Sequence, residues 1–294
     1  MRASSSLTWG GCTIPGDGGV PAVAVSLTGP TAAHARAQAR HAIDAGADVL
    51  ELRVDLLEEV DALVAFTEAP GEEPSTTDSM VVTTAAAQVL ECLRRMADVV
   101  DVTPLLLTCR TAAEGGRARL DDSGYSALLC SVLDELAGWE PGRRPSAVDV
   151  EVQRGCLPQV SEQAHGLGID VVASFHDFKA TPVDDVLEDV LSRMASEGAD
   201  LAKIAVWPTG ADDVARLLGM CARAAAAPGE GTGLGLPVAA MSMGALGAVS
   251  RVAPVFGSAL TFAVVPDEQG ETQASAPGQL PIQDVRRCLE LLRA

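Results

Sequence analysis

One lysine in a strongly apolar segment is the residue best suited to covalent chemistry. The sequence holds 21 Lys and Arg residues, of which only Lys179 and Lys203 are lysines. Lys203 lies in the segment LAKIAVW, where burial disfavours the ammonium form and leaves the free amine that can attack a carbonyl carbon. Arginine cannot lose its proton to do this. We therefore expect Lys203 to form a Schiff base, with a purely structural ion pair as the alternative, and Lys179 to be a solvated surface lysine.

A histidine at the end of the preceding apolar segment could move protons beside that lysine. His176 follows VVASF, and the two segments are adjacent if they are neighbouring strands. A histidine next to a Schiff base can remove the proton on the carbon beside the iminium, and a carboxylate such as Glu114 can orient its ring. The alternative for His176 is a structural role with its hydrogen bonds satisfied.

Charged pairs also stand at the ends of apolar segments. Glu51 and Arg53 are two positions apart, as are Asp149 and Glu151, so each pair shares one face of a strand. Facing a helix layer unpaired would cost each pair on the order of several kcal/mol. We expect both pairs to point into the mouth of a barrel, the first as functional groups and the second as a salt-bridge cluster.

The elements that would position these residues alternate along the chain. Short runs rich in Val, Ile and Leu predict eight strands, at Ala22–Thr28, Asp48–Arg53, Pro104–Arg110, Ala147–Val152, Val171–Phe175, Leu201–Val206, Pro237–Met243 and Ala259–Val265. Helical periodicity between them predicts helices at Thr31–Ala45, Ser79–Ala97, Tyr125–Trp139, Pro182–Ala195, Ala211–Ala227 and Ile282–Leu292.

Eight nearly continuous apolar strands favour a closed α/β fold, the (β/α)8 or TIM barrel. An open doubly wound sheet is the alternative, but the turn SLTGPT after the first strand lacks the glycine fingerprint of a dinucleotide site. We predict an N-terminal segment over residues 1–20, with a hairpin turn at Thr13–Gly19, and a barrel catalytic domain over residues 21–294. In such a barrel the charged strand ends form the active-site rim.

The composition limits the partners. A formal net charge of −19 argues against a nucleic-acid or anionic-membrane partner and favours a small-molecule substrate held by locally placed arginines. The sequence shows no run long and apolar enough to span a membrane and no signal-peptide core, so we expect a cytoplasmic protein. Seven scattered cysteines without a CxxC pair predict reduced thiols and no metal site.

With these residues in place, the chain resembles the type I 3-dehydroquinate dehydratases of the shikimate pathway. The resemblance runs from Pro21 to the C-terminus. Its motifs, in order, are ELRVDLL (51–57), TCRTAAEGG (108–116), SFHDFKATP (174–182), ADLAKIAVWP (199–208), MSMGALGAVSR (241–251), FGSALTF (256–262) and ASAPGQLPI (274–282).

The resemblance implies a hydro-lyase that removes water from 3-dehydroquinate by syn elimination, giving 3-dehydroshikimate, without a metal or cofactor. Lys203 matches the imine-forming lysine, His176 the acid/base group, and Glu114 the carboxylate that orients the histidine. Further positions match the family's substrate-binding residues: Ser26, Glu51, Arg53, Arg110, Arg251, Ser275 and Gln279. Arg251 matches the arginine on the substrate carboxylate, and the resemblance also implies a homodimer.

Three features depart from the family pattern. The segment Pro266–Thr272 is longer and more acidic, Glu68–Asp78 reads as an inserted surface loop, and Leu246 stands where members often carry an acidic residue. Two other functions remain open. An aldolase-like lyase would need a phosphate cradle, for which ASAPGQ is a poor match, and a non-catalytic binder would be expected to have lost one of the catalytic groups.

Overall fold

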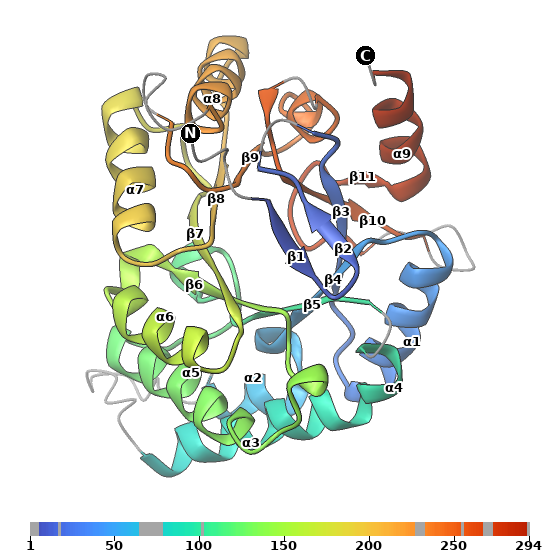
Figure 1. Ribbon diagram of the computed structural model, residues 1–294, viewed down its shortest axis with the longest axis vertical. Coiled ribbons are helices and arrows are strands. Elements are labelled where there is room, and N and C mark those ends of the chain that lie inside the picture. The colour runs from blue at the N-terminus through green and yellow to red at the C-terminus, as the bar shows by residue number, and fades with distance from the viewer. Residues whose placement is uncertain are drawn as a thin grey trace.

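Eight parallel strands close into a barrel in the computed structural model, which describes residues 6–16, 19–64, 79–100, 103–226, 233–253, 256–266 and 273–292 (Figure 1). The strands are β3 (Ala22–Leu27), β4 (Val49–Arg53), β5 (Leu105–Thr108), β6 (Ala147–Glu151), β7 (Asp170–Asp177), β8 (Leu201–Val206), β9 (Val238–Ser242) and β10 (Leu260–Val264). Their pairing order is β10-β3-β4-β5-β6-β7-β8-β9. A bridge between Val238 and Ser258 joins β9 to the segment before β10 and closes the ring. The predicted barrel is confirmed.

Helices form the outer layer around this sheet. They are α1 (Ala32–Asp44), α2 (Glu58–Val64), α3 (Ser79–Arg95), α4 (Ala97–Val100), α5 (Asp122–Leu136), α6 (Leu157–Gly166), α7 (Asp184–Ser196), α8 (Ala211–Ala224) and α9 (Ile282–Leu291). All six predicted helices are present. The sequence did not predict α2, α4 and α6, because seven, four and ten residues give few helical repeats. Pro158 also obscured α6, although proline is tolerated in the first helical turn, where it lies.

A β-hairpin packs on the N-terminal end of the barrel. Strands β1 (Leu7–Trp9) and β2 (Cys12–Ile14) pair in antiparallel register around Gly10 and Gly11, and Gly10 has a φ of 55°. The predicted turn at Thr13–Gly19 is therefore wrong, because Thr13 belongs to β2. The glycine pair supplies the left-handed backbone of the tight turn.

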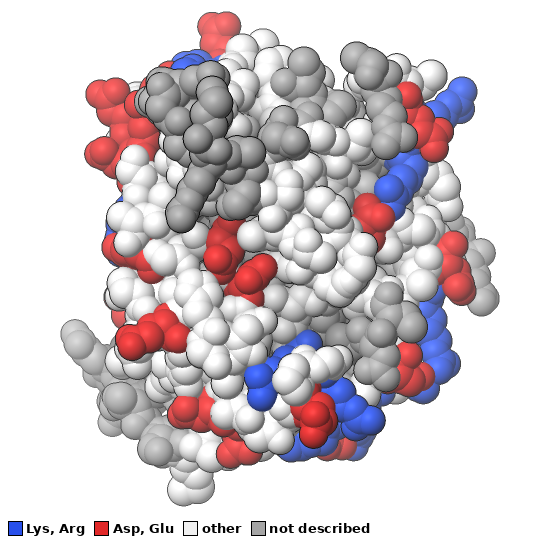
Figure 2. Space-filling view, in the orientation of Figure 1, with Lys and Arg blue, Asp and Glu red and all other residues white. Residues whose placement is uncertain are grey.

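The hairpin contributes two large side chains to the barrel interior. Trp9 and Ile14 are buried among inward side chains of the strands, and Trp9 Nε1 donates a hydrogen bond to Asp170 Oδ2 at 2.8 Å. On the face that carries the hairpin, charged side chains of both signs lie mainly toward the edges (Figure 2). No helix of the described chain is long and apolar enough to cross a membrane.

Inside the barrel, side chains stack in layers to which alternate strands each contribute one residue. The lower layers are apolar, with Val49 and Leu106 as examples. Higher up, β4, β6, β8 and β10 contribute a mixed layer of Glu51, Asp149, Lys203 and Phe262, whose contacts confirm that they meet at the barrel axis. This layer forms the floor of the mouth. Two segments that depart from the family pattern lie outside the described residues. They are Glu68–Asp78, and Pro266–Thr272 from position 267 onward.

Candidate active site

A cavity opens at the C-terminal ends of the strands. Its walls include every predicted site residue except Ser26, together with apolar residues from the same rim; the lining is Glu51, Arg53, Arg110, Glu114, Gly115, His176, Phe178, Lys203, Ala205, Met241, Arg251, Phe262, Ser275, Ala276 and Gln279. Residues up to 228 positions apart in the chain therefore meet at one site, from Glu51 to Gln279. This is the face on which barrel enzymes carry their chemistry.

Lys203 lies in the middle of β8 with its amine pointing to the cavity floor. The residue is 4% exposed, and Nζ lies 3.3 Å from Glu51 Oε1 and 3.2 Å from Asp149 Oδ2. Nζ also lies 4.5 Å from the centre of the Phe262 ring, a distance suited to a cation–π contact. Two carboxylates therefore contact the Lys203 amine, although the residues that flank Lys203 in the strand are apolar. By contrast Lys179 is exposed, as predicted.

For Asp149, the sequence predicted one of the two contacts that the structure shows. The prediction put it in a salt-bridge cluster, and it does pair with Arg110 at 2.8 Å. It also contacts the Lys203 amine directly, which was not predicted. The signal available in the sequence was strand alternation: Glu51, Asp149 and Lys203 belong to every second strand, and such residues share a layer.

His176 and Glu114 form a hydrogen-bonded pair beside the lysine. His176 Nδ1 lies 2.8 Å from Glu114 Oε2, and the ring belongs to β7, which pairs with β8. Burial lowers the pKa of His176 well below 6.5, and the nearby cations Arg110 and Lys203 lower it further. Burial also raises the pKa of Glu114 to about 8. At neutral pH the ring is therefore uncharged and can accept a proton.

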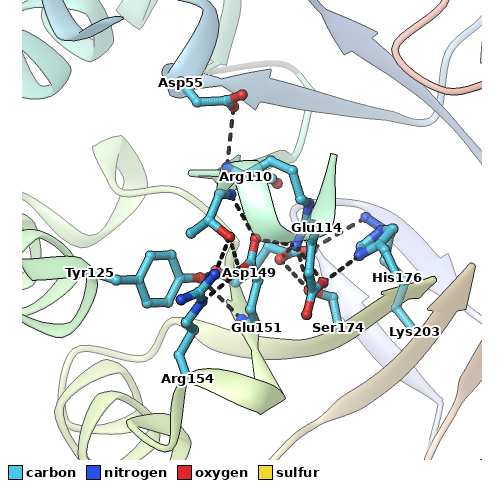
Figure 3. A network of polar contacts seen from close by, with 12 residues as sticks. Asp55, Arg110, Glu114, Tyr125, Asp149, Glu151, Arg154, Ser174, His176 and Lys203 are labelled. Carbon is cyan, nitrogen blue, oxygen red and sulfur yellow. Dashed lines mark hydrogen bonds and ion pairs between the residues drawn. The ribbon is translucent and has the colours of Figure 1, made fainter. Parts of the chain in front are cut away.

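Arg110 joins these groups into one polar network (Figure 3). Its Nη1 donates to Ser174 Oγ at 2.8 Å and to Glu151 Oε1 at 3.1 Å, and lies 3.5 Å from Glu114 Oε2. Glu151 in turn accepts from the backbone N–H of Thr111 at 2.7 Å, which fixes the turn that carries Glu114. The expected salt-bridge role of Glu151 agrees with this geometry. Most of the Arg110 guanidinium is engaged by protein groups, so it organises the site as well as lining it.

Arg251 is a buried cation of a different kind. It is 2% exposed, and its Nη atoms approach only backbone carbonyls, of Phe262 at 3.5 Å and Pro277 at 3.1 Å. Nε has no partner, and no described carboxylate forms an ion pair with this side chain. Burial lowers the pKa of Arg251 to about 10. A guanidinium held in this way is suited to binding a ligand carboxylate, whose two oxygens match its geometry.

The loop after β10 reaches the cavity through serine and glutamine side chains. Ser275 Oγ donates to Ser26 Oγ at 2.8 Å and accepts from Gln279 Nε2 at 3.0 Å. Ser26 Oγ donates in turn to Glu51 Oε2. Ser26 therefore lies beside the cavity and links the loop to the carboxylate that holds Lys203, rather than lining the cavity itself.

A lysine amine and a histidine–carboxylate pair at the mouth of a (β/α)8 barrel define a class of barrel enzymes equipped for imine chemistry. The type I 3-dehydroquinase family model matches residues 23–294. The chain is 33% identical to the 3-dehydroquinate dehydratase of Listeria monocytogenes over 277 residues, 93% of each chain, and 33% identical to that of Klebsiella pneumoniae over 275 residues, 92% of each chain. The chain thus belongs to the type I 3-dehydroquinase family.

Solved structures agree with this assignment. The 3-dehydroquinate dehydratase of Geobacillus kaustophilus superposes with a TM-score of 0.79 at 27% identity, covering 99% of this chain and 98% of that one. The type I enzyme of Clostridium difficile, solved with covalently modified comenic acid, gives a TM-score of 0.77 at 27% identity, covering 98% and 97%. The family, the fold and the hydro-lyase class expected from the sequence are confirmed.

Proposed function

We propose that this chain dehydrates 3-dehydroquinate to 3-dehydroshikimate with Lys203 as the imine-forming residue. The observation that carries the assignment is the position of the Lys203 amine, which is buried at the floor of the cavity beside the His176–Glu114 pair. Few buried lysines are placed where a small ketone can reach them, and an amine there can act as a nucleophile.

The reaction follows from these groups. The free amine of Lys203 attacks the substrate ketone, and loss of water gives an iminium that acts as an electron sink. Neutral His176 removes a proton from the carbon next to the iminium carbon. The hydroxyl on the following carbon then leaves as water, taking the proton that His176 carries. Hydrolysis of the product iminium frees the ketone and restores the amine.

Glu114 supports His176 in both steps. Its Oε2 lies 2.8 Å from Nδ1 and so fixes the ring orientation, leaving Nε2 for the substrate. A carboxylic group whose pKa is raised to about 8 can share a proton with the ring as the ring gains and loses charge. We therefore assign Glu114 an orienting and charge-balancing role.

Substrate binding uses the remaining rim residues. The unpaired guanidinium of Arg251 would hold the substrate carboxylate. Glu51, Arg53 and Arg110 line the floor and wall and would contact ring hydroxyls, with Ser275 and Gln279 above. Ser26 acts through its hydrogen bonds to Glu51 and Ser275.

A spectrophotometric assay with 3-dehydroquinate tests the function. The wild type should form an ultraviolet-absorbing enone, and Lys203→Met should lose this activity while it keeps the barrel fold by circular dichroism. Lys179→Met is the matched control, because Lys179 is exposed and should leave the rate unchanged. Undiminished enone formation by Lys203→Met would refute the assignment, and ligand binding without turnover by the wild type would favour a non-catalytic binder.

We also infer a cytoplasmic homodimer in which residues 1–20 form an N-terminal segment and residues 21–294 the catalytic domain. Light scattering coupled to size exclusion should give twice the mass of one chain. The apolar residues Leu291 and Leu292 are 75% and 55% exposed at the end of α9, so this helix is one candidate for the contact.

A further inference from the structure

Asp149 divides its two carboxylate oxygens between two cations. Oδ2 lies 3.2 Å from Lys203 Nζ, whereas Oδ1 accepts from Arg110 Nη2 at 2.8 Å and from Ser174 Oγ at 2.6 Å. The residue is fully buried in the mixed layer of the barrel. Both oxygens are therefore held in place by groups on other strands or loops, and the carboxylate cannot turn away from Lys203 without losing them.

Glu51 also contacts Lys203, but its surroundings differ. Glu51 lines the cavity, and its other side-chain donors are the neutral hydroxyls of Ser26 and Thr108. Asp149 is fully buried and is not among the residues that line the cavity. Glu51 can exchange a hydrogen bond with Lys203 for one with a ligand, whereas Asp149 has no such alternative partner.

The charge state of Asp149 is stable. Burial by itself would raise its pKa, but Arg110 and Lys203 outweigh that effect and lower it. Asp149 is therefore an anion at neutral pH and does not serve as a proton acceptor for Lys203.

We propose that Asp149 is the fixed counter-ion of the Lys203 ammonium and of the iminium that replaces it. The ammonium has three N–H donors and can satisfy both carboxylates, whereas a protonated imine nitrogen has one. The nitrogen gives up a proton to attack the ketone and becomes positively charged again when water leaves to form the iminium. Asp149 keeps its contact in both charged states, while Glu51 turns to the ligand. Asp149 is thus a positioning residue. The iminium part of this proposal rests on the proposed function, while the ammonium part concerns the free enzyme.

Other charged groups surround the same nitrogen and must be separated from Asp149 in any test. They are Glu51 from β4, His176 from β7, Arg110 and Glu114 from the segment after β5, and Arg53 and Arg251, which line the same cavity. Only the carboxylates of Glu51 and Asp149 hydrogen-bond to Nζ among the described residues. When Asp149 alone is replaced by a neutral residue, Lys203 should therefore lose its proton at a lower pH than in the wild type.

The chain offers a direct measurement, because it contains only two lysines. Labelling with lysine carrying ¹³C at Cε gives two signals in a pH titration by nuclear magnetic resonance. In Asp149→Asn, the midpoint for Lys203 should fall by about 1–2 pH units, since an opposite charge within about 4–6 Å favours the charged form. The Lys179 signal should not move. Asp149→Ser removes the charge without placing amide N–H groups against the cations, and replaces the asparagine variant if that fails to fold.

The matched control is Ser174→Ala, which removes a neutral donor from Oδ1 and leaves the charge in place. It should keep the Lys203 midpoint of the wild type. An unchanged midpoint in a folded Asp149 variant would overturn the proposal. Borohydride trapping gives the second reading: the yield of ligand adduct should fall in the Asp149 variant at high pH, and an unchanged yield would refute the iminium part. If the wild type itself gave no adduct, the proposed function would fail while the titration still decided the ammonium part.

Discussion

Arg251 carries a positive charge into the barrel mouth with no described carboxylate to balance it. Burying a charge without an ionic partner is costly, and the lowering of its pKa to about 10 reflects that cost. A protein keeps such a group where a ligand completes the pair. Stability and binding should therefore move in opposite directions when the charge is removed.

The first prediction follows for Arg251→Met. Without ligand, the unfolding free energy should rise by on the order of 1 kcal/mol, seen as a Tm higher by about 2–4 °C for a chain of this size. At the same time kcat/KM should fall by roughly 100-fold or more, because truncating one partner of a buried charge pair costs about 2–5 kcal/mol. Arg117→Met, at an exposed arginine, should change neither quantity. A lower Tm together with an unchanged kcat/KM would show that Arg251 is structural.

His176 provides the second prediction, on pH. Its pKa lies well below 6.5 because of burial and of Arg110 and Lys203, so the ring should be neutral at pH 6.5. In a pH titration followed by nuclear magnetic resonance, the histidine ring signal that is absent from His176→Asn should titrate below pH 6.5. In the unfolded chain His176 binds a proton near pH 6.5, whereas in the folded protein it stays neutral at that pH. Protonation therefore favours the unfolded state, and His176 makes the protein less stable as the pH falls below 6.5. A ring still protonated at pH 6.5 would place the proton of the pair on His176 instead of Glu114.

At this scale the sequence predicted most of the site. Strand-end positions and apolar flanks were enough to select Lys203 and His176, because the geometry of parallel strands brings their C-terminal ends together. The Asp149–Lys203 contact was not predicted, since it depends on which residues two strands apart share a layer. Strand alternation indicates that residues of β6 and β8 can share a layer, but the particular pair depends on the pairing register, which no local pattern contains.

At the scale of elements, the turn between Thr111 and Gly116 places Glu114. A 3₁₀ turn at Ala112–Glu114 follows the bridge residue Thr111, and Gly116 N–H donates to the Thr111 carbonyl at 2.8 Å. A Cβ atom on Gly116 would lie 2.1 Å from the Arg110 carbonyl oxygen. This oxygen belongs to the backbone, so no side-chain rotation could relieve the clash. Gly116 is therefore required by close packing. Gly115 has a φ of 81°, and a Cβ atom there would lie 2.4 Å from the Phe178 ring.

The third prediction is that Gly116→Ala displaces Glu114 and lowers kcat. A misplacement of about 1 Å can cost on the order of 100-fold in rate, and the lost packing should lower Tm as well. The matched control is Gly142→Ala, because a Cβ atom there meets nothing within 4 Å. It should retain the wild-type rate and Tm. Wild-type kcat in Gly116→Ala would mean that the turn adapts without moving the carboxylate.

At the scale of the whole molecule, the barrel has two ends with separate tasks. The charged layer and the cavity lie at the C-terminal end, while the hairpin residues Trp9 and Ile14 fill the N-terminal end. Eight nearly continuous apolar runs, with helical patterns between them, predicted the eight strands and their closure. The predicted hairpin turn came too late, because Pro-Gly-rich residues after Ile14 gave a stronger turn signal than the Gly10–Gly11 pair that makes the turn.

The fourth prediction separates the two ends. Trp9→Ala should lower the unfolding free energy by about 3–5 kcal/mol, because a large buried side chain is lost, and it also removes the hydrogen bond to Asp170. The kcat at a temperature where the variant remains folded should stay within about twofold of the wild type, since large effects come from displaced catalytic groups. Thr13→Ala, at an exposed position of β2, should preserve both values. A large loss of kcat without unfolding would show that the two ends are coupled.

Reduction of the imine on the protein tests the central claim most directly. The wild type is incubated with 3-dehydroshikimate, treated with borohydride and digested with a protease. The masses of the peptides are then measured by mass spectrometry. Because the chain contains only Lys179 and Lys203, the site of addition is unambiguous. The account predicts that the mass of the reduced ligand appears on the Lys203 peptide alone and is absent from Lys203→Met. An unmodified Lys203 peptide from protein that is active under the same conditions would contradict it.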